Sequence, residues 1–221
     1  MTSADQNSAT PQPSRRSPRG RPPGTSPREL ELIALELFTA HGFDETTVEQ
    51  IAERAGISSR TFFRYFESKA SVLWHEFDHE VEALRAAFAE VSQELPMMDA
   101  IRQVVVGVNR YRAEDLPELR MRMNLVGSVS ALHASAALHY DAWERAVSDF
   151  AASRLGQTAD SLYPLSIGRT TLAACRSAFD RWVALGGADL TVYLDASIRA
   201  LAVGFDEDAL RSSAASDHLP G

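Results

Sequence analysis

The segment His75-Glu76-Phe77-Asp78-His79 has the residue types and spacing of a hydrolytic zinc site. Two histidines four residues apart on a helix can bind one zinc ion, and the intervening glutamate can act as the general base. A catalytic zinc also needs a third protein ligand and a walled cleft. The apolar stripe of this helix places both histidines on the opposite, solvent-facing side. We therefore predict no metal and no cofactor, and keep a zinc-dependent hydrolase as the alternative function.

A second set of residues has the spacing of a DNA-reading helix. Arg60 and Arg64 lie one turn apart, and Phe62 and Phe66 fall on the opposite face. An arginine can donate two hydrogen bonds to O6 and N7 of a guanine in the major groove, while the phenylalanines hold the helix on a core. The alternative is an ordinary solvated helix face. Ser59 and Thr61 flank the first arginine.

The N-terminal segment is basic and contains a possible minor-groove motif. Pro18-Arg19-Gly20-Arg21-Pro22 resembles the core of an AT-hook, in which Arg19 and Arg21 lie along a narrow A·T minor groove. Residues 1–25 are rich in Ser, Thr, Pro and Gly, so we predict a disordered basic arm. A passive solubilising tail is the alternative.

Three helices are predicted to position these groups. Ser26 begins the first with Pro27 at its first position, and Gly42 ends it. A Thr46-x-x-Glu49 capping box opens the second helix, and Ser58 caps the third. Two short helices joined through a glycine-containing turn are typical of a helix-turn-helix domain, which we place at 26–70.

The rest of the chain is also predicted to be helical. A long helix carries apolar residues at intervals of three and four from Leu73 to Leu95, and Pro96 ends it. Further helices are expected at 98–113, 116–128, 131–155, 159–186 and 189–205, and alternating strand patterns are absent from the sequence. The predicted fold class is all-α, with a larger helical domain at 71–205 and a flexible tail at 206–221.

Composition limits the function classes. The 221 residues are 45% hydrophobic and 24% charged, which excludes collagen-like, mucin-like and fully disordered proteins. The net charge is −8, but residues 1–70 hold 9 basic and 9 acidic side chains, so the whole acidic excess lies after residue 70. No apolar run reaches the ~18 residues of a membrane span, and no signal peptide is recognisable. A single cysteine, Cys175, is compatible with the reducing cytoplasm.

The residues of the first three helices resemble the TetR family of bacterial transcriptional regulators. The resemblance rests on Phe38, Gly42, Phe43, Thr46, Thr47, Val48, Ile51, Ala52, Ala55, Gly56, Ile57, Ser58, Thr61, Phe62, Phe63, Tyr65, Phe66, Ser68 and Lys69. It implies phosphate contacts from Thr47, Tyr65 and Lys69, with Ser59, Arg60, Thr61 and Arg64 facing a double-stranded operator. Phe63 stands where the family commonly has tyrosine. The resemblance further implies a homodimer built on the last two long helices, and a second domain that binds a small-molecule effector.

The effector site is predicted from two groups of residues. His139 and Trp143 share an apolar helix face, and four arginines flank the turn near Leu116: Arg110, Arg112, Arg120 and Arg122. Phe179, on a later apolar stripe, completes the set. A core histidine and solvated arginines are the alternatives. Residues in this domain also resemble regulators associated with mycofactocin biosynthesis clusters, which implies a long-chain acyl-coenzyme A effector whose phosphates the arginines would attract.

Overall fold

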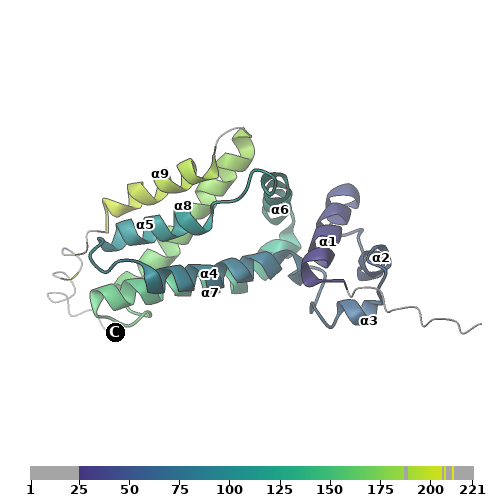
Figure 1. The fold of residues 1–221 in the computed structure, drawn as a ribbon, viewed down its shortest axis with the longest axis horizontal. Coiled ribbons are helices and arrows are strands. Elements are labelled where there is room, and N and C mark those ends of the chain that lie inside the picture. The colour runs from purple at the N-terminus through teal and green to yellow at the C-terminus, as the bar shows by residue number, and fades with distance from the viewer. Residues whose placement is uncertain (1–24, 187–188, 206, 208–210, 212–221) are drawn as a thin grey trace, which may run out of the picture.

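The computed structural model describes residues 25–186, 189–205, 207 and 211, and these residues form an elongated, all-helical molecule (Figure 1). The predicted all-α fold class is confirmed: the described residues contain no strand. The elements are α1 (Pro27–His41), α2 (Val48–Arg54), α3 (Ser59–Phe62), a 3₁₀ turn η1 (Ser71–Trp74), α4 (His75–Glu90), α5 (Met97–Val108), α6 (Leu116–Ser128), α7 (Ser130–Leu155), α8 (Leu162–Leu185) and α9 (Leu190–Ala202).

The first helix begins and ends where the sequence predicts. The Ser26 hydroxyl accepts a hydrogen bond from the Glu29 N–H at 3.1 Å, and Pro27 occupies the first position. Gly42 ends α1 with φ +89°, a conformation that favours glycine because it has no Cβ. Leu30, Ala34 and Phe38 lie on the buried face.

The predicted capping box of α2 is wrong by one residue. Thr47 is the cap: its hydroxyl accepts from the Gln50 N–H at 3.2 Å, and Gln50 Oε1 accepts from the Thr47 N–H at 2.8 Å. Thr46 is instead buried, and its hydroxyl donates to the Gly42 carbonyl at 2.8 Å. Either threonine has the chemistry of a cap, so the choice depends on which side chain the preceding turn buries.

The core of the three-helix domain extends into the larger domain. Phe62 and Phe66 pack against α1, and Leu132 of α7 is fully buried in the same cluster. Met121 and Leu125 of α6 pack against this cluster from outside. The helix α6 lies between the bulk of the larger domain and α1 (Figure 1), and through Met121 and Leu125 it contacts the core of the three-helix domain.

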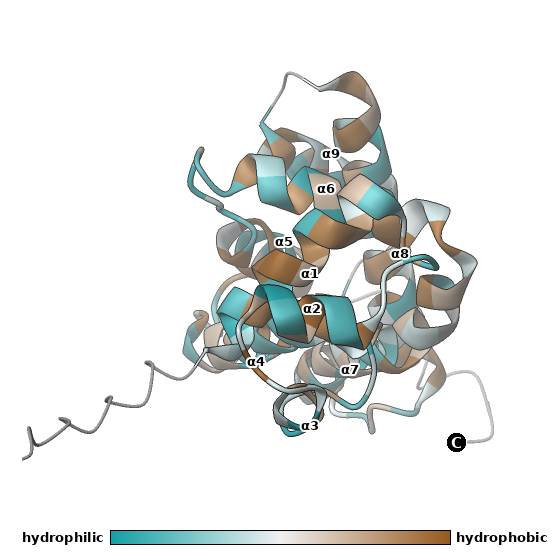
Figure 2. Cartoon of the chain, turned by 90° about the vertical axis from the view of Figure 1, so that its right-hand side faces the viewer, coloured by the Kyte–Doolittle hydropathy of each residue, from teal (hydrophilic) through white to brown (hydrophobic). Residues whose placement is uncertain are grey.

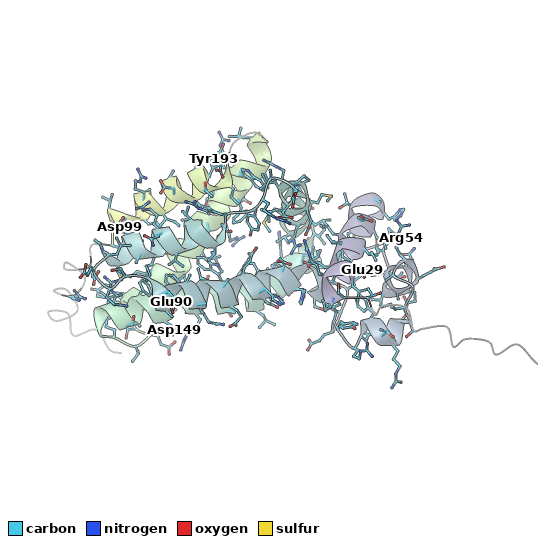
Figure 3. All side chains as sticks on the ribbon, in the orientation of Figure 1. Glu29, Arg54, Glu90, Asp99, Asp149 and Tyr193 are labelled. Atoms are coloured by element: carbon cyan, nitrogen blue, oxygen red, sulfur yellow. The ribbon has the colours of Figure 1, made fainter. Side chains whose placement is uncertain are left out.

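The larger domain is a layered bundle in which α8 packs on α7 and α9, and α5 packs on α4 and α9. Asp99, at the start of α5, marks the end of the molecule opposite Glu29 and Arg54 (Figure 3). Phe88 and Phe150 stack in its core with ring centroids 4.4 Å apart. Among the described residues, no helix combines the length and the apolar character needed to cross a membrane.

Several predicted boundaries in this domain shift. The long helix predicted from Leu73 to Leu95 starts within η1 and becomes α-helical only at His75, and α4 ends at Glu90 rather than at Pro96. Most of the proposed tail lies outside the described residues. Glu207, however, accepts a hydrogen bond from the Met97 N–H at 3.0 Å, which ties this part of the tail to the start of α5.

Candidate functional site

The exposed face of α3 is the candidate DNA-reading surface. Phe62 and Phe66 are 0% and 6% exposed, whereas Arg60 and Arg64 are exposed. This division into a buried and an exposed face is as predicted. Hydrogen bonds from the Phe63 N–H to Ser59 O and from the Phe66 N–H to Phe62 O extend the helical turn beyond Phe62. Seen from the DNA-binding end, α2 presents many hydrophilic residues beside α3 (Figure 2).

The side chains around α3 leave several donors on this surface. Arg64 donates to the Tyr65 hydroxyl at 3.2 Å and lies 5.1 Å from its ring centroid. Ser59 and Thr61 are half-buried, and the Thr61 hydroxyl lies 3.0 Å from that of Ser58. The Thr47 hydroxyl is exposed, and while it accepts from Gln50 it can still donate its own hydrogen.

Two residues near this surface have unexpected surroundings. Phe63 is 53% exposed, so an apolar ring stands at the position where the resemblance leads one to expect a tyrosine hydroxyl. The Lys69 ammonium donates to three backbone carbonyls, those of Phe43 (2.6 Å), Thr46 (2.9 Å) and Asp44 (3.1 Å). Lys69 therefore fastens the loop between α1 and α2, and its phosphate contact stays a prediction. Arg19 and Arg21 lie outside the described residues.

A cavity of about 570 Å³ lies among the helices of the larger domain and reaches Arg28 of α1. Its wall comes from α4, α6, α7 and α8, from the chain after α5, and from Arg28 of α1. Most of the wall is apolar or aromatic, and includes Leu73, Trp74, Phe77, Leu119, Met123, Val126, Tyr140, Trp143, Leu172, Cys175 and Phe179. Such a chamber suits a ligand with a substantial apolar part.

The structure brings together some of the predicted effector residues. Arg112, Arg122, Trp143 and Phe179 line the cavity. Arg110 is not in its wall and borders a separate hollow between α4 and α5.

Two further members of the predicted set are also absent from the wall. Arg120 donates to the Trp182 carbonyl at 2.9 Å, and its guanidinium lies 3.8 Å from the Trp182 ring centroid. His139 stacks on Trp74 with centroids 4.8 Å apart, and its Nδ1 lies within hydrogen-bond distance of Asp78 Oδ1, at 2.7 Å. His139 therefore contacts the wall residue Trp74, whereas Arg120 contacts Trp182, which is not part of the wall.

A cluster of paired charges joins α1 to α6 at one end of the cavity. Arg28 forms ion pairs with Glu118 at 2.5 Å and with Glu31 at 3.0 Å. Arg122 forms ion pairs with Glu31 at 2.5 Å and with Glu118 at 2.6 Å. Burial alone lowers the pKa of Arg28, but the hydrogen bonds to Glu118 and Glu31 outweigh it and raise that pKa above its ordinary value. Both arginines are held as cations by carboxylates.

A second polar pair lies beside this cluster. Tyr111 donates a short hydrogen bond to Glu80 Oε1, and both residues line the cavity. Burial raises the pKa of Glu80 to about 7, although the hydrogen bond from Tyr111 opposes the rise. The cavity therefore contains a carboxyl group that titrates near neutral pH.

Sequence reasoning missed Arg28, Glu80, Tyr111 and Arg176, all of which line the cavity. One signal was available: Glu31 falls between Leu30 and Ala34 on the buried face of α1, and a charge there requires a partner from elsewhere. No comparable signal marks Arg176, because its place in the wall depends on how α8 packs.

The two histidines of the candidate zinc motif contact the helix backbone and each other. The His79 ring hydrogen-bonds the His75 carbonyl oxygen through Nδ1 at 2.8 Å, and the two rings meet edge to face. The part of the chain that the structure describes contains no group of three His, Cys, Asp or Glu residues able to hold a metal ion.

Comparisons with known proteins agree with this arrangement. Residues 33–73 match the model of bacterial regulatory proteins of the tetR family, and residues 95–206 match that of the MftR C-terminal domain. The chain is 29% identical over 187 residues to a Mycobacterium tuberculosis protein named as the mycofactocin biosynthesis transcriptional regulator MftR, covering 85% of this chain and 94% of that one.

Solved structures share the fold at lower identity. The fatty acid degradation regulator FadR from Bacillus halodurans is 16% identical with a TM-score of 0.57, over 83% of this chain and 96% of that one. Thermus thermophilus FadR, described as a repressor in complex with lauroyl-CoA, is 24% identical with a TM-score of 0.55, over 80% of this chain and 93% of that one.

Proposed function

Because the chain belongs to the tetR family of bacterial regulatory proteins and carries an MftR-type C-terminal domain, we propose that it is an effector-controlled repressor. It binds a roughly palindromic operator as a homodimer and releases it when an amphipathic effector fills the cavity. The family consists of transcriptional regulators, so the protein is not an enzyme and the zinc hydrolase alternative is discarded. We propose that it acts in the bacterial cytoplasm, where its target DNA lies.

The observation that carries this proposal is the position of Arg28. It belongs to the first helix of the DNA-binding domain, yet it forms part of the cavity wall. A ligand in the cavity can therefore contact α1, whose buried residues share one cluster with Phe62 and Phe66. If the two domains were joined only by a linker, a ligand in the cavity would have no contact through which to affect the DNA-binding surface.

The helix α6 offers a second route for the same signal. One set of its residues, Leu119, Met123 and Val126, lines the cavity, while Met121 and Leu125 pack against the core of the DNA-binding domain. A ligand that prefers a displaced α6 shifts the population toward that form. Two recognition helices must match half-sites one turn of DNA apart, or a multiple of it, so a change in their spacing weakens binding.

The cavity favours an effector with a long apolar part. Its volume lies within the roughly 300–1,000 Å³ of sites that enclose a small-molecule ligand, and aromatic and aliphatic side chains form most of its wall. A long-chain acyl-CoA is the first candidate. The lauroyl-CoA complex of T. thermophilus FadR, which has a similar fold, supports this choice.

Dimerisation through α8 and α9 is supported by apolar side chains left on their surfaces. Leu162 and Leu185 at the two ends of α8 are 54% and 53% exposed, and Val192 of α9 is 61% exposed. A two-fold contact between these helices would cover such side chains in both subunits at once. It would also fix the distance between the two DNA-binding domains.

Gel retardation tests the proposal. The full chain is mixed with DNA from upstream of its own gene and with a random competitor, with and without a panel of acyl-CoA esters. We expect preference for the upstream fragment and release by at least one long-chain ester. Absence of any sequence preference at low salt would contradict the regulator, whereas specific binding that no ester alters would contradict only the effector class. Deleting residues 1–25 should reduce the salt dependence of binding if the arm contacts phosphates.

A further inference from the structure

The arginines of the cavity wall differ in whether they are already paired. The described part of the wall contains Arg28, Arg112, Arg122 and Arg176. Arg28 and Arg122 are bound by Glu31 and Glu118, and Arg112 is bound by Asp115 at 2.9 Å and by Glu114 at 2.6 Å.

Arg176 has different surroundings. Between residues 25 and 186 and between 189 and 205, no carboxylate forms an ion pair with Arg176, and its guanidinium lies 5.1 Å from the Tyr140 ring centroid. Asp180, one turn further along α8, is also exposed in the wall. A guanidinium over an aromatic face keeps its donors available to an incoming anion.

Arg176 lies at the rim of the cavity. Its neighbours on α8, Leu172 and Cys175, are 5% and 4% exposed, so this helix turns its apolar face inward and leaves Arg176 in contact with solvent. Gly127 of α6 and His133 of α7 are also exposed residues of the cavity wall. A charged group held here keeps its hydration while its apolar partner is buried.

The part of the cavity wall around Arg28 and Arg122 is unsuited to an anion. The two guanidinium groups of Arg28 and Arg122 lie there among four carboxyl groups, those of Glu31, Glu76, Glu80 and Glu118. An anionic head group entering this part would have to displace a carboxylate from each arginine and would face the remaining carboxylates. An uncharged, apolar chain end displaces no carboxylate and can pack on the neighbouring aromatic wall.

We propose that Arg176, resting on Tyr140, binds the anionic head group of the effector at the cavity rim, with the acyl chain inside. The inference rests on the proposed function, because it concerns the same cavity and the same ligand class. It differs from the expectation that Arg110, Arg112, Arg120 and Arg122 attract the head group. The volume of about 570 Å³ lies within the roughly 300–1,000 Å³ of sites that enclose a small-molecule ligand, so the cavity has room for an acyl chain.

The test measures ligand binding by the full-length protein, using lauroyl-CoA and laurate as probes and 1-dodecanol as an uncharged analogue. The variants are Arg176→Gln, Arg176→Lys and a matched control, Arg181→Gln, which changes an exposed arginine of α8 outside the cavity wall. We expect Arg176→Gln to weaken lauroyl-CoA binding roughly 10-fold or more, because a charge-assisted contact is lost. Arg176→Lys should recover part of that loss, and the control should bind like wild type.

The ligand series separates head-group binding from chain binding. Dodecanol should bind wild type and Arg176→Gln equally, and a loss with laurate as well would indicate that any terminal anion is recognised rather than a CoA phosphate. Wild-type binding of lauroyl-CoA together with an unchanged Arg176→Gln variant would overturn this inference and leave the proposed function standing. Failure of the wild type to bind any acyl probe would overturn the proposed effector class, and the inference with it.

Discussion

Arg28 at the start of α1 donates two hydrogen bonds to the carboxylate of Glu118 on α6, at 2.8 and 2.5 Å, across 90 residues of sequence. The same carboxylate accepts from Arg122 of α6 at 2.6 Å. Glu118 thus links the DNA-binding domain to a helix that lines the effector cavity. Because a hydrogen-bonded ion pair requires close contact, this link breaks if α6 moves away from α1.

The first prediction concerns this link. Glu118→Gln keeps the size of the side chain but removes one of the two carboxylates that Arg28 and Arg122 share, leaving both arginines on Glu31. We expect the free energy of unfolding to fall by about 2 kcal/mol. The ratio of operator affinities without and with lauroyl-CoA should also shrink. Urea unfolding and gel retardation measure the two effects. Glu114→Gln is the control, since Glu114 is 68% exposed and pairs with Arg112 at the surface; equal behaviour of the two variants would contradict the role of Glu118.

The second prediction concerns DNA reading by α3. If Arg64 reads a base edge, as we propose, Arg64→Ala should weaken operator binding by about 1–3 kcal/mol and relax the preference for one base pair. Its exposed position means that the thermal midpoint should hardly change. Fluorescence anisotropy with the operator and single-base variants gives both quantities. The surface variant Arg145→Ala on α7 is the control, and an Arg64→Ala protein with wild-type affinity and selectivity would refute the assignment.

The third prediction concerns pH. Burial raises the pKa of Glu80 to about 7 from the ordinary 4.5, so between these values the folded protein keeps a proton that the unfolded chain has released. The ionisation of Glu80 therefore lowers the free energy of unfolding as the pH rises from about 4.5 to about 7. Glu80→Gln removes that contribution, and the amide oxygen of the new side chain can still accept a hydrogen bond from Tyr111. The free energy of unfolding of this variant, relative to wild type, should increase by up to ~3 kcal/mol between pH 4.5 and 8.

Urea unfolding of wild type and Glu80→Gln at several pH values measures this effect. Glu82→Gln serves as the control, because Glu82 is 74% exposed on the same helix. Parallel pH profiles for wild type and Glu80→Gln would show that the carboxyl group of Glu80 titrates normally.

The fourth prediction concerns the contact between α7 and α8. A Cβ atom at Gly168 would lie 2.6 Å from the Glu144 carbonyl oxygen and would also clash with the Ser148 hydroxyl. Gly168→Ala should therefore destabilise the protein by about 1–3 kcal/mol, because the two helices must separate. Gly107→Ala is the matched control within α5: space is open there, and the better helix former should add about 0.5–1 kcal/mol. Equal thermal midpoints for the two variants would contradict this packing.

Local features of the molecule could be predicted from the residue order. Ser26, Pro27 and Gly42 delimit α1 because capping and left-handed turns depend on the residue itself and its near neighbours. The burial of Phe62 opposite the exposed Arg60 likewise follows from the helical period, which relates residues a few positions apart. The family resemblance rests on the same short segment.

The cavity and its charges depended on tertiary packing. Arg28 and Glu118 are 90 positions apart, and no local rule pairs them. The arginines near Leu116 are close in sequence, yet Arg120 contacts Trp182 and Arg112 pairs with its own neighbours. Packing places Arg176, which is distant in sequence, at the cavity rim. Sequence determined which helices form and which faces are apolar; only the packing of these helices decided which charges are neutralised, because Coulomb interactions depend on distance in space rather than along the chain.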